Sequence, residues 1–210
     1  MNQKGVLAVV SGFSGAGKGT LMKELLKHHD SYALSISATT RQPREGEVDG
    51  REYFFLTKEK FEQMIAENAF IEYAQYVDNY YGTPRKYVED CLNAGKDVIL
   101  EIEVQGAMLV KKQYPEAVTI FVTPPSASEL KNRLVGRGTE TYDVIRGRMQ
   151  RAAEEAGLMN FYDYLLINDD LEESTRELHE LIVQSHKSMG LQGEFIENIK
   201  NELNEINKGE

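Results

Sequence analysis

Gly12-Phe13-Ser14-Gly15-Ala16-Gly17-Lys18-Gly19 matches the P-loop pattern G-x-x-x-x-G-K. In such a loop, successive backbone N–H groups point at a phosphate and the lysine adds a mobile positive charge. Residues 6–10 form a short apolar run typical of a buried parallel strand. Residues 20–26 carry leucines at helical spacing. Strand, loop and helix follow in the order that phosphate binding requires, so we expect residues 12–20, Thr20 included, to bind a nucleoside triphosphate.

Gly19 stands where most P-loops carry a serine or threonine that ligates Mg²⁺. The ion would then be held by Thr20, by water molecules or by a carboxylate elsewhere. Glu101 is a candidate because it ends the apolar run 98–100, as an acidic residue at the C-terminal end of a strand facing the P-loop. We expect Mg²⁺ as a cofactor with Thr20 or Glu101 as ligands, Glu101 acting through water. Alternatively, Glu101 orders the acceptor site.

Composition limits the class of protein. The 210 residues suit one domain, and the single cysteine, Cys91, excludes an internal disulfide, so we expect a cytoplasmic protein. No apolar stretch approaches the roughly 20 residues that span a bilayer, and the N-terminal run is too short for a signal peptide. The net charge of −10 argues against nucleic-acid or anionic-membrane partners.

The positive charge is concentrated in two clusters, which suggests bound phosphate groups. One cluster is Arg41, Arg44 and Arg51, and the other is Lys131, Arg133, Arg137, Arg146, Arg148 and Arg151. For Lys131 and Arg151, a solvated helix face is an equal alternative.

Strand-like runs alternate with helical patterns, which predicts a parallel sheet covered by helices on both faces. The runs are residues 6–11, 33–37, 97–102, 117–122 and 165–168. Thr83 is predicted as a helix N-cap, with Pro84 at the first helical position and Gly95 at the end. Ser126 and Glu129 form the capping box of a later helix.

Three segments depart from this core of residues 1–37, 84–135 and 152–187. Residues 38–83 are interpreted as a mixed insertion that binds the phosphoryl acceptor. Residues 136–151 are predicted to be a mobile lid, with a polar loop over 136–147. Residues 188–210 contain an amphipathic helix that packs either on its own domain or on another copy of the chain, giving a homo-oligomer.

Beyond the P-loop, six motifs resemble those of guanylate kinases. They are residues 37–44 (SATTRQPR), 46–53 (GEVDGREY), 79–83 (NYYGT), 101–106 (EIEVQG), 137–140 (RGTE) and 168–170 (NDD). Their order and spacing make the resemblance specific, and it extends to about His186. It implies an α/β P-loop kinase fold, with a parallel sheet flanked by helices, a mixed α+β GMP-binding insertion and a short helical lid.

The family resemblance also implies reversible transfer of the γ-phosphoryl group of ATP to GMP, with Mg²⁺, giving ADP and GDP for GTP synthesis and purine recycling. We expect dGMP to be used as well. The acceptor phosphate has a second pKa of about 6, so it is already largely dianionic and needs no general base. Catalysis is then mostly positioning and charge stabilisation, for which arginine is well suited.

On the acceptor side, the resemblance implies that the GMP phosphate contacts Ser37, Arg41, Arg44, Tyr53 and Tyr81. Lys18 and Arg41 belong to the expected catalytic set together with the arginines that bridge both phosphates, which are Arg133, Arg137 and Arg148. Arg148, rather than Arg146, matches the family pattern.

Guanine recognition calls for acceptors facing the base N1–H and 2-amino groups and a donor facing O6. Glu72 and Glu103 resemble the accepting carboxylates, and the Thr83 hydroxyl replaces a serine of relatives as the donor. Some relatives have aspartate in place of Glu103. Glu101 completes the expected GMP set, while Asn168 and Arg137 resemble residues beside the adenine of ATP.

Two other functions compete with this interpretation. Adenylate kinases share G-x-x-x-x-G-K-G-T, but the acidic guanine-edge set and the tyrosine-rich insertion argue against them. A guanylate-kinase-like interaction module, which binds phosphorylated proteins, needs only the acceptor pocket. Lys18, the P-loop glycines and the lid arginines argue for an enzyme instead.

Overall fold

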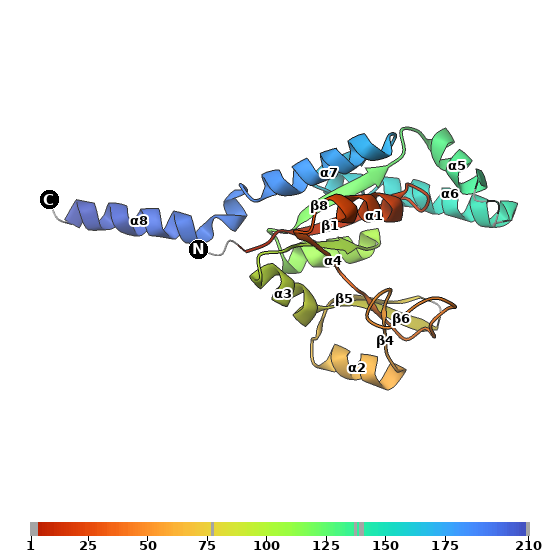
Figure 1. The fold of residues 1–210 in the computed structure, drawn as a ribbon, viewed down its shortest axis with the longest axis horizontal. Coiled ribbons are helices and arrows are strands. Elements are labelled where there is room, and N and C mark those ends of the chain that lie inside the picture. Colours follow the sequence, from red (N-terminus) through yellow and green to blue (C-terminus); the bar gives the residue numbers. More distant parts are fainter. Residues whose placement is uncertain (1–3, 77, 137, 139–140, 209–210) are drawn as a thin grey trace.

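A computed structural model describes residues 4–76, 78–136, 138 and 141–208 (Figure 1). A five-stranded sheet in the order β2-β7-β1-β8-β9 forms its centre, and every strand pair in it is parallel. The strands are β1 (Leu7–Gly12), β2 (Tyr32–Leu34), β7 (Asp97–Glu101), β8 (Val118–Thr123) and β9 (Tyr164–Ile167). The predicted fold class is confirmed.

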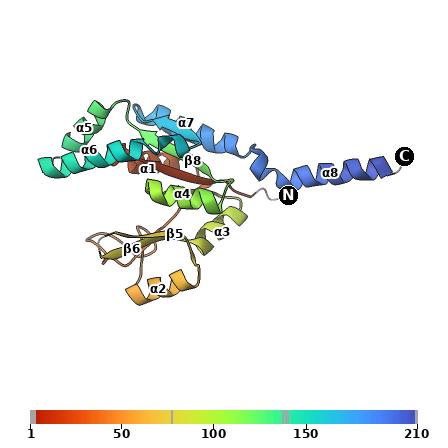
Figure 2. The ribbon, with the colours of Figure 1, turned by 180° about the vertical axis from the view of Figure 1, so that it is seen from behind.

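Helices cover both faces of this sheet because its strands are apolar on both sides. On one face, α1 (Lys18–His28) and α7 (Leu171–Ser185) pack together with β1 and β8 around the buried Leu25, Leu178 and Ile182. On the other face, α3 (Arg85–Asn93) and α4 (Val104–Gln113) enclose Val88, Val110 and their neighbours. Figures 1 and 2 show these two helical layers above and below the sheet.

A second, mixed sheet of order β4-β3-β6-β5 lies beside the core. Its elements are β3 (Ala38–Thr39), β4 (Phe54–Phe55), α2 (Lys58–Ala66), β5 (Phe70–Tyr76) and β6 (Asn79–Pro84). The fully buried Phe61 ring stacks on Phe70 at 4.3 Å and on Tyr80 at 5.2 Å between centroids. This small sheet therefore has an aromatic core of its own.

Arg85 fastens the small sheet to the core. Its guanidinium donates to Phe70 O at 2.9 Å, to Gln113 Oε1 at 2.9 Å and to the Tyr114 hydroxyl at 2.7 Å. Gln113 in turn donates to Ile71 O at 2.7 Å. These bonds join β5 to the C-terminal end of α4, so the acceptor half has a defined position relative to the central sheet.

The remaining helices lie beyond the ends of the sheet. They are α5 (Ala127–Gly136), α6 (Tyr142–Ala156), the short η1 (Met159–Phe161) and η2 (Met189–Leu191), and α8 (Gly193–Lys208). The amphipathic α8 projects away from the body in both views and buries none of its residues (Figures 1 and 2). Among the helices described, none is long and apolar enough to cross a membrane.

Several predicted boundaries are wrong. Pro84, and not Thr83, is the N-cap of α3, because Thr83 is paired within the small sheet as part of β6. The strand expected over 33–37 ends at Leu34, and β3 begins the other sheet at Ala38. The polar loop expected over 136–147 is shorter, since α6 starts at Tyr142.

Two helix-end predictions are confirmed in whole or in part. Gly95 follows the end of α3 with φ +80°, a conformation that favours glycine. At α5, the Glu129 N–H donates to Ser126 Oγ at 3.0 Å, which is one half of a capping box. The other half is absent from this helix, because the Glu129 carboxylate instead accepts from Arg133 at 2.8 Å.

Candidate active site

The P-loop connects the end of β1 to the start of α1, and its glycines are required by its geometry. Gly12 has φ +152°, and a β-carbon there would lie 2.1 Å from Val122 O. Gly17 has φ +91°, and a β-carbon there would lie 2.5 Å from Asn168 Nδ2. Phe13 turns its ring into the core against Phe121, with centroids 5.0 Å apart. Phe13 therefore offers a ligand only its backbone.

Lys18 and Ser14 already have partners within this site. Lys18 Nζ donates to Gly12 O at 2.7 Å and to Phe13 O at 3.2 Å. Ser14 Oγ accepts a hydrogen bond from Arg148 Nη1 of α6. The P-loop cation and one of the predicted bridging arginines thus meet at the same loop.

Asn168 supports the P-loop from β9. Its side chain is buried, with the residue 6% exposed, and donates from Nδ2 to Ala16 O at 2.8 Å. The backbone carbonyl of Asn168 accepts a hydrogen bond from Arg133 Nη1 at 3.0 Å. Arg133 Nε also donates to the Glu129 carboxylate. This chain of contacts orients Arg133 beside the loop. The predicted residue Arg137 lies outside the described residues.

Gly19 and Thr20 form the exposed first turn of α1. A β-carbon on Gly19 would meet no atom within 4 Å, so space is not the reason for glycine. Protein atoms restrict the hydration of the Glu101 carboxylate and raise its pKa, while the Lys18 ammonium lowers it. Within the described residues, no group of three or more His, Cys, Asp or Glu side chains is arranged to hold a metal ion.

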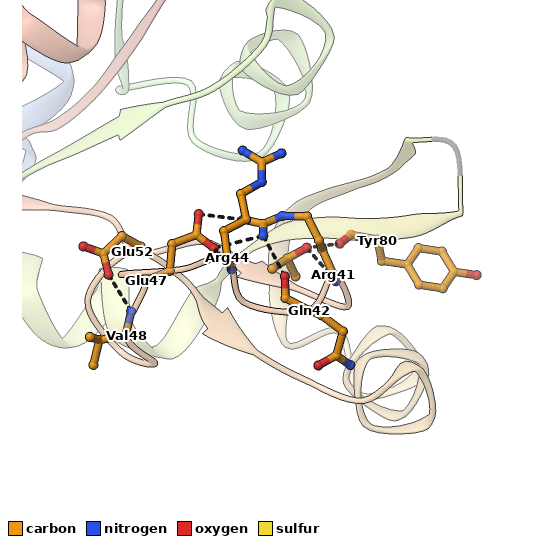
Figure 3. A network of polar contacts seen from close by, with 8 residues as sticks. Arg41, Gln42, Arg44, Glu47, Val48, Glu52 and Tyr80 are labelled. Carbon is orange, nitrogen blue, oxygen red and sulfur yellow. Dashed lines mark hydrogen bonds and ion pairs between the residues drawn. The ribbon is translucent and has the colours of Figure 1, made fainter.

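Arg41 lies in the loop that follows β3 and pairs with Glu47 (Figure 3). Its Nη1 and Nη2 donate to the two carboxylate oxygens at 2.9 Å each, and Nη1 also donates to Gln42 O at 2.7 Å. Glu47 also accepts from the Arg44 N–H at 2.7 Å. These bonds lower the pKa of Glu47, so the carboxylate stays ionised.

The Nε edge of Arg41 is not used by Glu47 or Gln42, although the guanidinium also interacts with the Tyr81 hydroxyl. A guanidinium has five N–H donors, of which three are used by Glu47 and Gln42. The Nε edge can still bind a phosphate in a bidentate manner. The guanidinium carbon lies 5.3 Å from the Tyr53 ring centroid, which fixes its plane further.

The other predicted ligands of the acceptor phosphate are Tyr53, Tyr81, Arg44 and Ser37, and all of them belong to the insertion or to the residue just before it. The Tyr53 and Tyr81 rings meet edge to face at 6.2 Å. Arg44 is exposed, and among the described residues its guanidinium makes no hydrogen bond or ion pair, although its backbone N–H donates to Glu47. Figure 3 shows its guanidinium standing clear of Glu47. Ser37 is partly exposed immediately before β3.

Glu72 of β5 faces the first turn of α4. Its Oε1 accepts from the Thr83 hydroxyl at 2.7 Å. A β-carbon built on Gly106 would lie 3.2 Å from its Oε2. Burial raises the pKa of Glu72, while the bond from Thr83 acts in the opposite direction. Thr83 itself is fully buried.

Glu103 is the N-cap of α4, the helix whose first turn faces Glu72. Its side chain does not cap the helix and is 72% exposed. Instead, its carboxylate accepts from Arg151 Nη2 at 3.0 Å. Glu72 belongs to β5 of the small sheet, and Glu103 follows β7 of the central sheet. Their relative position depends on how the two sheets pack, which the sequence alone does not give.

The contacts of Glu47 and Arg151 do not follow from the sequence analysis. Glu47 lies within one of the family motifs, and its spacing of six residues from Arg41 follows no helical or strand rule. For Arg151, the sequence is equally consistent with a solvated helix face. Its place three residues after Arg148 on a helix was an available signal, because i and i+3 side chains share a face.

Comparisons with known proteins give one consistent family. The guanylate kinase family model matches residues 4–185. A guanylate kinase of Clostridioides difficile (strain 630) is 54% identical over 202 residues, covering 96% of this chain and 98% of that protein. The guanylate kinase of Bacillus subtilis (strain 168) is 51% identical over 187 residues, covering 89% and 92% respectively.

Structural comparison agrees with the sequence comparison. The crystal structure of guanylate kinase from Anaplasma phagocytophilum matches with a TM-score of 0.71 at 31% identity, covering 90% of this chain and 89% of that one. The extent and identity of these matches show that this chain belongs to the guanylate kinase family.

Proposed function

We propose that this chain transfers the γ-phosphoryl group of ATP to GMP, and also to dGMP, in a reversible reaction. A phosphate oxygen of GMP forms a bond to the γ-phosphorus while the bond from that phosphorus to the β,γ-bridging oxygen breaks, giving GDP and ADP. The observation that carries the acceptor assignment is that Glu72 packs against Gly106 in the first turn of α4, the helix whose N-cap is Glu103. Guanine has ring and amino donors for two carboxylates, and adenine lacks them on that edge.

The acceptor phosphate is held in this proposal by Arg41, Arg44, Ser37, Tyr53 and Tyr81. Glu47 fixes Arg41 by its Nη edge, so that the remaining edge receives the phosphate. Because Glu47 also neutralises part of the Arg41 charge, Arg44 supplies the uncompensated positive charge.

The donor triphosphate is held by the P-loop backbone from Gly12 to Thr20 and by Lys18. For Lys18 to reach a phosphate, its ammonium exchanges the carbonyls of Gly12 and Phe13 for phosphate oxygens. Arg133 and Arg148 then stabilise the charge that develops between donor and acceptor. Arg137 is proposed for the same role and, with Asn168, for the adenine side.

The donor set around the P-loop fits Mg²⁺. The available protein groups are the hard oxygens of Thr20 and Glu101, and Mg²⁺ commonly uses only one or two such groups along with phosphates and water. The absence of a three-carboxylate cluster among the described residues agrees with this mode. When bound, Mg²⁺ neutralises charge on the ATP phosphates.

We further propose that α8 joins copies of the chain into a homo-oligomer. Phe195, Ile199, Leu203 and Ile206 are all exposed on this projecting helix. An apolar face of this kind is commonly covered by a partner, and a second copy is always present. The single cysteine supports a cytoplasmic location.

A nucleotide panel tests the proposed reaction. ATP consumption coupled to ADP detection is measured with GMP, dGMP, AMP, UMP and CMP at equal concentrations. GMP is expected to be turned over fastest, with AMP lower by roughly 10⁴-fold in kcat/KM because the carboxylates lose their partners. A faster reaction with AMP than with GMP would contradict the assignment.

A further inference from the structure

Arg151 lies between two carboxylates that belong to different elements. Its Nη2 donates to Glu103 Oε2 at 3.0 Å, and its Nε donates to Glu155 Oε1 at 3.1 Å. Glu103 begins α4, whereas Glu155 lies one turn after Arg151 on α6. The guanidinium therefore bridges the lid helix and the helix that carries the base-recognition carboxylate.

The Glu155 side of this bridge differs from an ordinary surface ion pair. Glu155 is only 5% exposed, and burial raises its pKa while the bond from Arg151 lowers it. The negative charge of Glu103 also raises the pKa of Glu155, so the two carboxylates repel one another across Arg151. The hydrogen bond to this buried carboxyl group anchors one side of the guanidinium.

The Glu103 end of the bridge is exposed to solvent. The Glu103 side chain is 72% exposed and makes no helix-capping bond, so Arg151 is the group that limits its orientation. A cavity of about 300 Å³ lies next to Arg151 and is lined by Gln105, Gln150, Glu154 and Glu155 among others.

We propose that Arg151 is a positioning residue for guanine recognition, which holds the Glu103 carboxylate ready for the base from an anchor at Glu155. This inference rests on the proposed function, because it requires that Glu103 accepts from guanine. Arg148, one turn earlier on α6, contacts Ser14 of the P-loop. The same face of one helix thus touches the donor loop through Arg148 and the acceptor-base carboxylate through Arg151.

The test compares Arg151→Ala with Arg146→Ala. Arg146 is on the same helix, is exposed, and has no hydrogen bond or ion pair with any described residue, so its removal changes charge without changing the bridge. Arg151→Ala is expected to raise the KM for GMP about tenfold, the size of one lost charge-assisted contact. The KM for ATP stays within about twofold, and Arg146→Ala behaves as the parent enzyme.

A selectivity measurement separates positioning from general loosening. IMP lacks the 2-amino group of GMP, so the ratio of kcat/KM for GMP to that for IMP reports the carboxylate contact. This ratio is expected to fall several-fold in Arg151→Ala and to recover partly in Arg151→Lys. Melting temperatures are recorded for all variants. If Arg151→Ala does not fold because the buried Glu155 carboxylate has lost its cation, the double variant Arg151→Gln with Glu155→Gln replaces it in the same measurements.

Glu103→Gln distinguishes failure of this inference from failure of the proposed function. If Glu103→Gln leaves the KM for GMP unchanged, Glu103 does not bind guanine and the proposed site is wrong. If Glu103→Gln weakens GMP but Arg151→Ala does not, only the role of Arg151 is overturned. A lower KM for GMP in Arg151→Ala would also overturn it, because Arg151 would then compete with the base.

Discussion

Lys18 is the residue on which the proposed turnover is expected to depend most directly. In the structure its ammonium donates to two P-loop carbonyls, which places it beside the loop that is proposed to hold the donor phosphates. Lys18→Ala is expected to lower kcat on the order of 10²–10³-fold, as for loss of one transition-state donor. Binding of GMP, measured by calorimetry, stays nearly unchanged because Lys18 belongs to the donor half.

Lys23→Ala is the matched control for Lys18→Ala. It removes the same charge from the exposed face of α1 without touching the loop. If Lys18→Ala turned GMP over at the parent rate, the chain would be better described as a binding module than as a kinase.

Glu72 links activity to pH through its buried position. Because burial raises its pKa, it becomes protonated at a higher pH than an ordinary glutamate. Protonation removes an acceptor for guanine, so kcat/KM for GMP is expected to fall as pH decreases through this raised pKa. Glu72→Gln lowers kcat/KM and removes this acid limb, which a pH profile of both enzymes would reveal.

Acidification is expected to affect stability through Glu72 in the direction opposite to its effect on activity. A raised folded-state pKa means that the native protein binds more protons than the unfolded chain between the two pKa values. The free energy of unfolding of the parent protein, relative to Glu72→Gln, should therefore increase as pH falls through this window and level off below the unfolded-state pKa. Denaturant titrations at several pH values measure this difference. A relative stability that decreased on acidification would contradict the burial of Glu72.

We expect Gly19, in the first turn of α1, to accept a serine side chain, whereas Gly17, the N-cap of α1, does not. A β-carbon at Gly19 meets no atom within 4 Å, and serine is the better helix former by a few tenths of a kcal/mol. Gly19→Ser is expected to raise the melting temperature by about 1–2 °C, to keep turnover at saturating Mg²⁺, and to lower the Mg²⁺ concentration needed for half-maximal activity. Calorimetry and a Mg²⁺ titration measure these effects.

Gly17→Ser is the control for Gly19→Ser. Its φ of +91° and the amide of Asn168 exclude a side chain, so this variant should lose stability and ATP binding together. Unchanged Mg²⁺ dependence in Gly19→Ser would mean that the first turn of α1 does not contact the ion.

The elements that sequence predicts best are those with local signals. The five core strands are short apolar runs, and Gly95 and Ser126 mark helix ends by their own backbone chemistry. The prediction for Thr83 is wrong because its N-cap signal is local, whereas its bond to Glu72 comes from a residue eleven positions away and its place in β6 depends on the small sheet. Tertiary pairing overrides a capping preference of about 1 kcal/mol.

The site shows the same division between local and distant information. The P-loop is contiguous, so its glycines and Lys18 follow from spacing alone. The meeting of Glu72 with the turn that carries Glu103 depends on how β5 packs on α4. The Arg41–Glu47 pair and the contact of Arg151 with Glu103 depend on loop and helix placement, whereas the i, i+4 spacing of Arg151 and Glu155 on one helix is a local signal.

At the scale of the whole molecule, α8 is an appendage rather than part of the folded core. It buries none of its residues and projects from the body (Figure 1), and the family match ends at residue 185. Removal of residues 193–210, which leaves Leu191 and Gln192 in place against the core, is expected to change the free energy of unfolding of a single subunit by about 1 kcal/mol or less. KM and kcat for both nucleotides stay close to those of the full chain.

The same truncation tests the proposed oligomer. Analytical ultracentrifugation is expected to show an assembly for the full chain and a monomer for the truncated one. Ile199→Glu with Leu203→Glu keeps the helix but removes its apolar face, and should also give a monomer. A full chain that sediments as a monomer at all concentrations would disprove assembly through α8.

The hydrogen bond from Asn168 to Ala16 spans 152 residues and ties the P-loop to the last strand of the sheet. During synthesis, residues 12–20 leave the ribosome early, yet the amide that supports them arrives only when about four-fifths of the chain has been made. An incomplete or C-terminally degraded chain therefore keeps the P-loop sequence without its support. The P-loop gains this hydrogen bond only after the residue that follows β9 has been added to the chain.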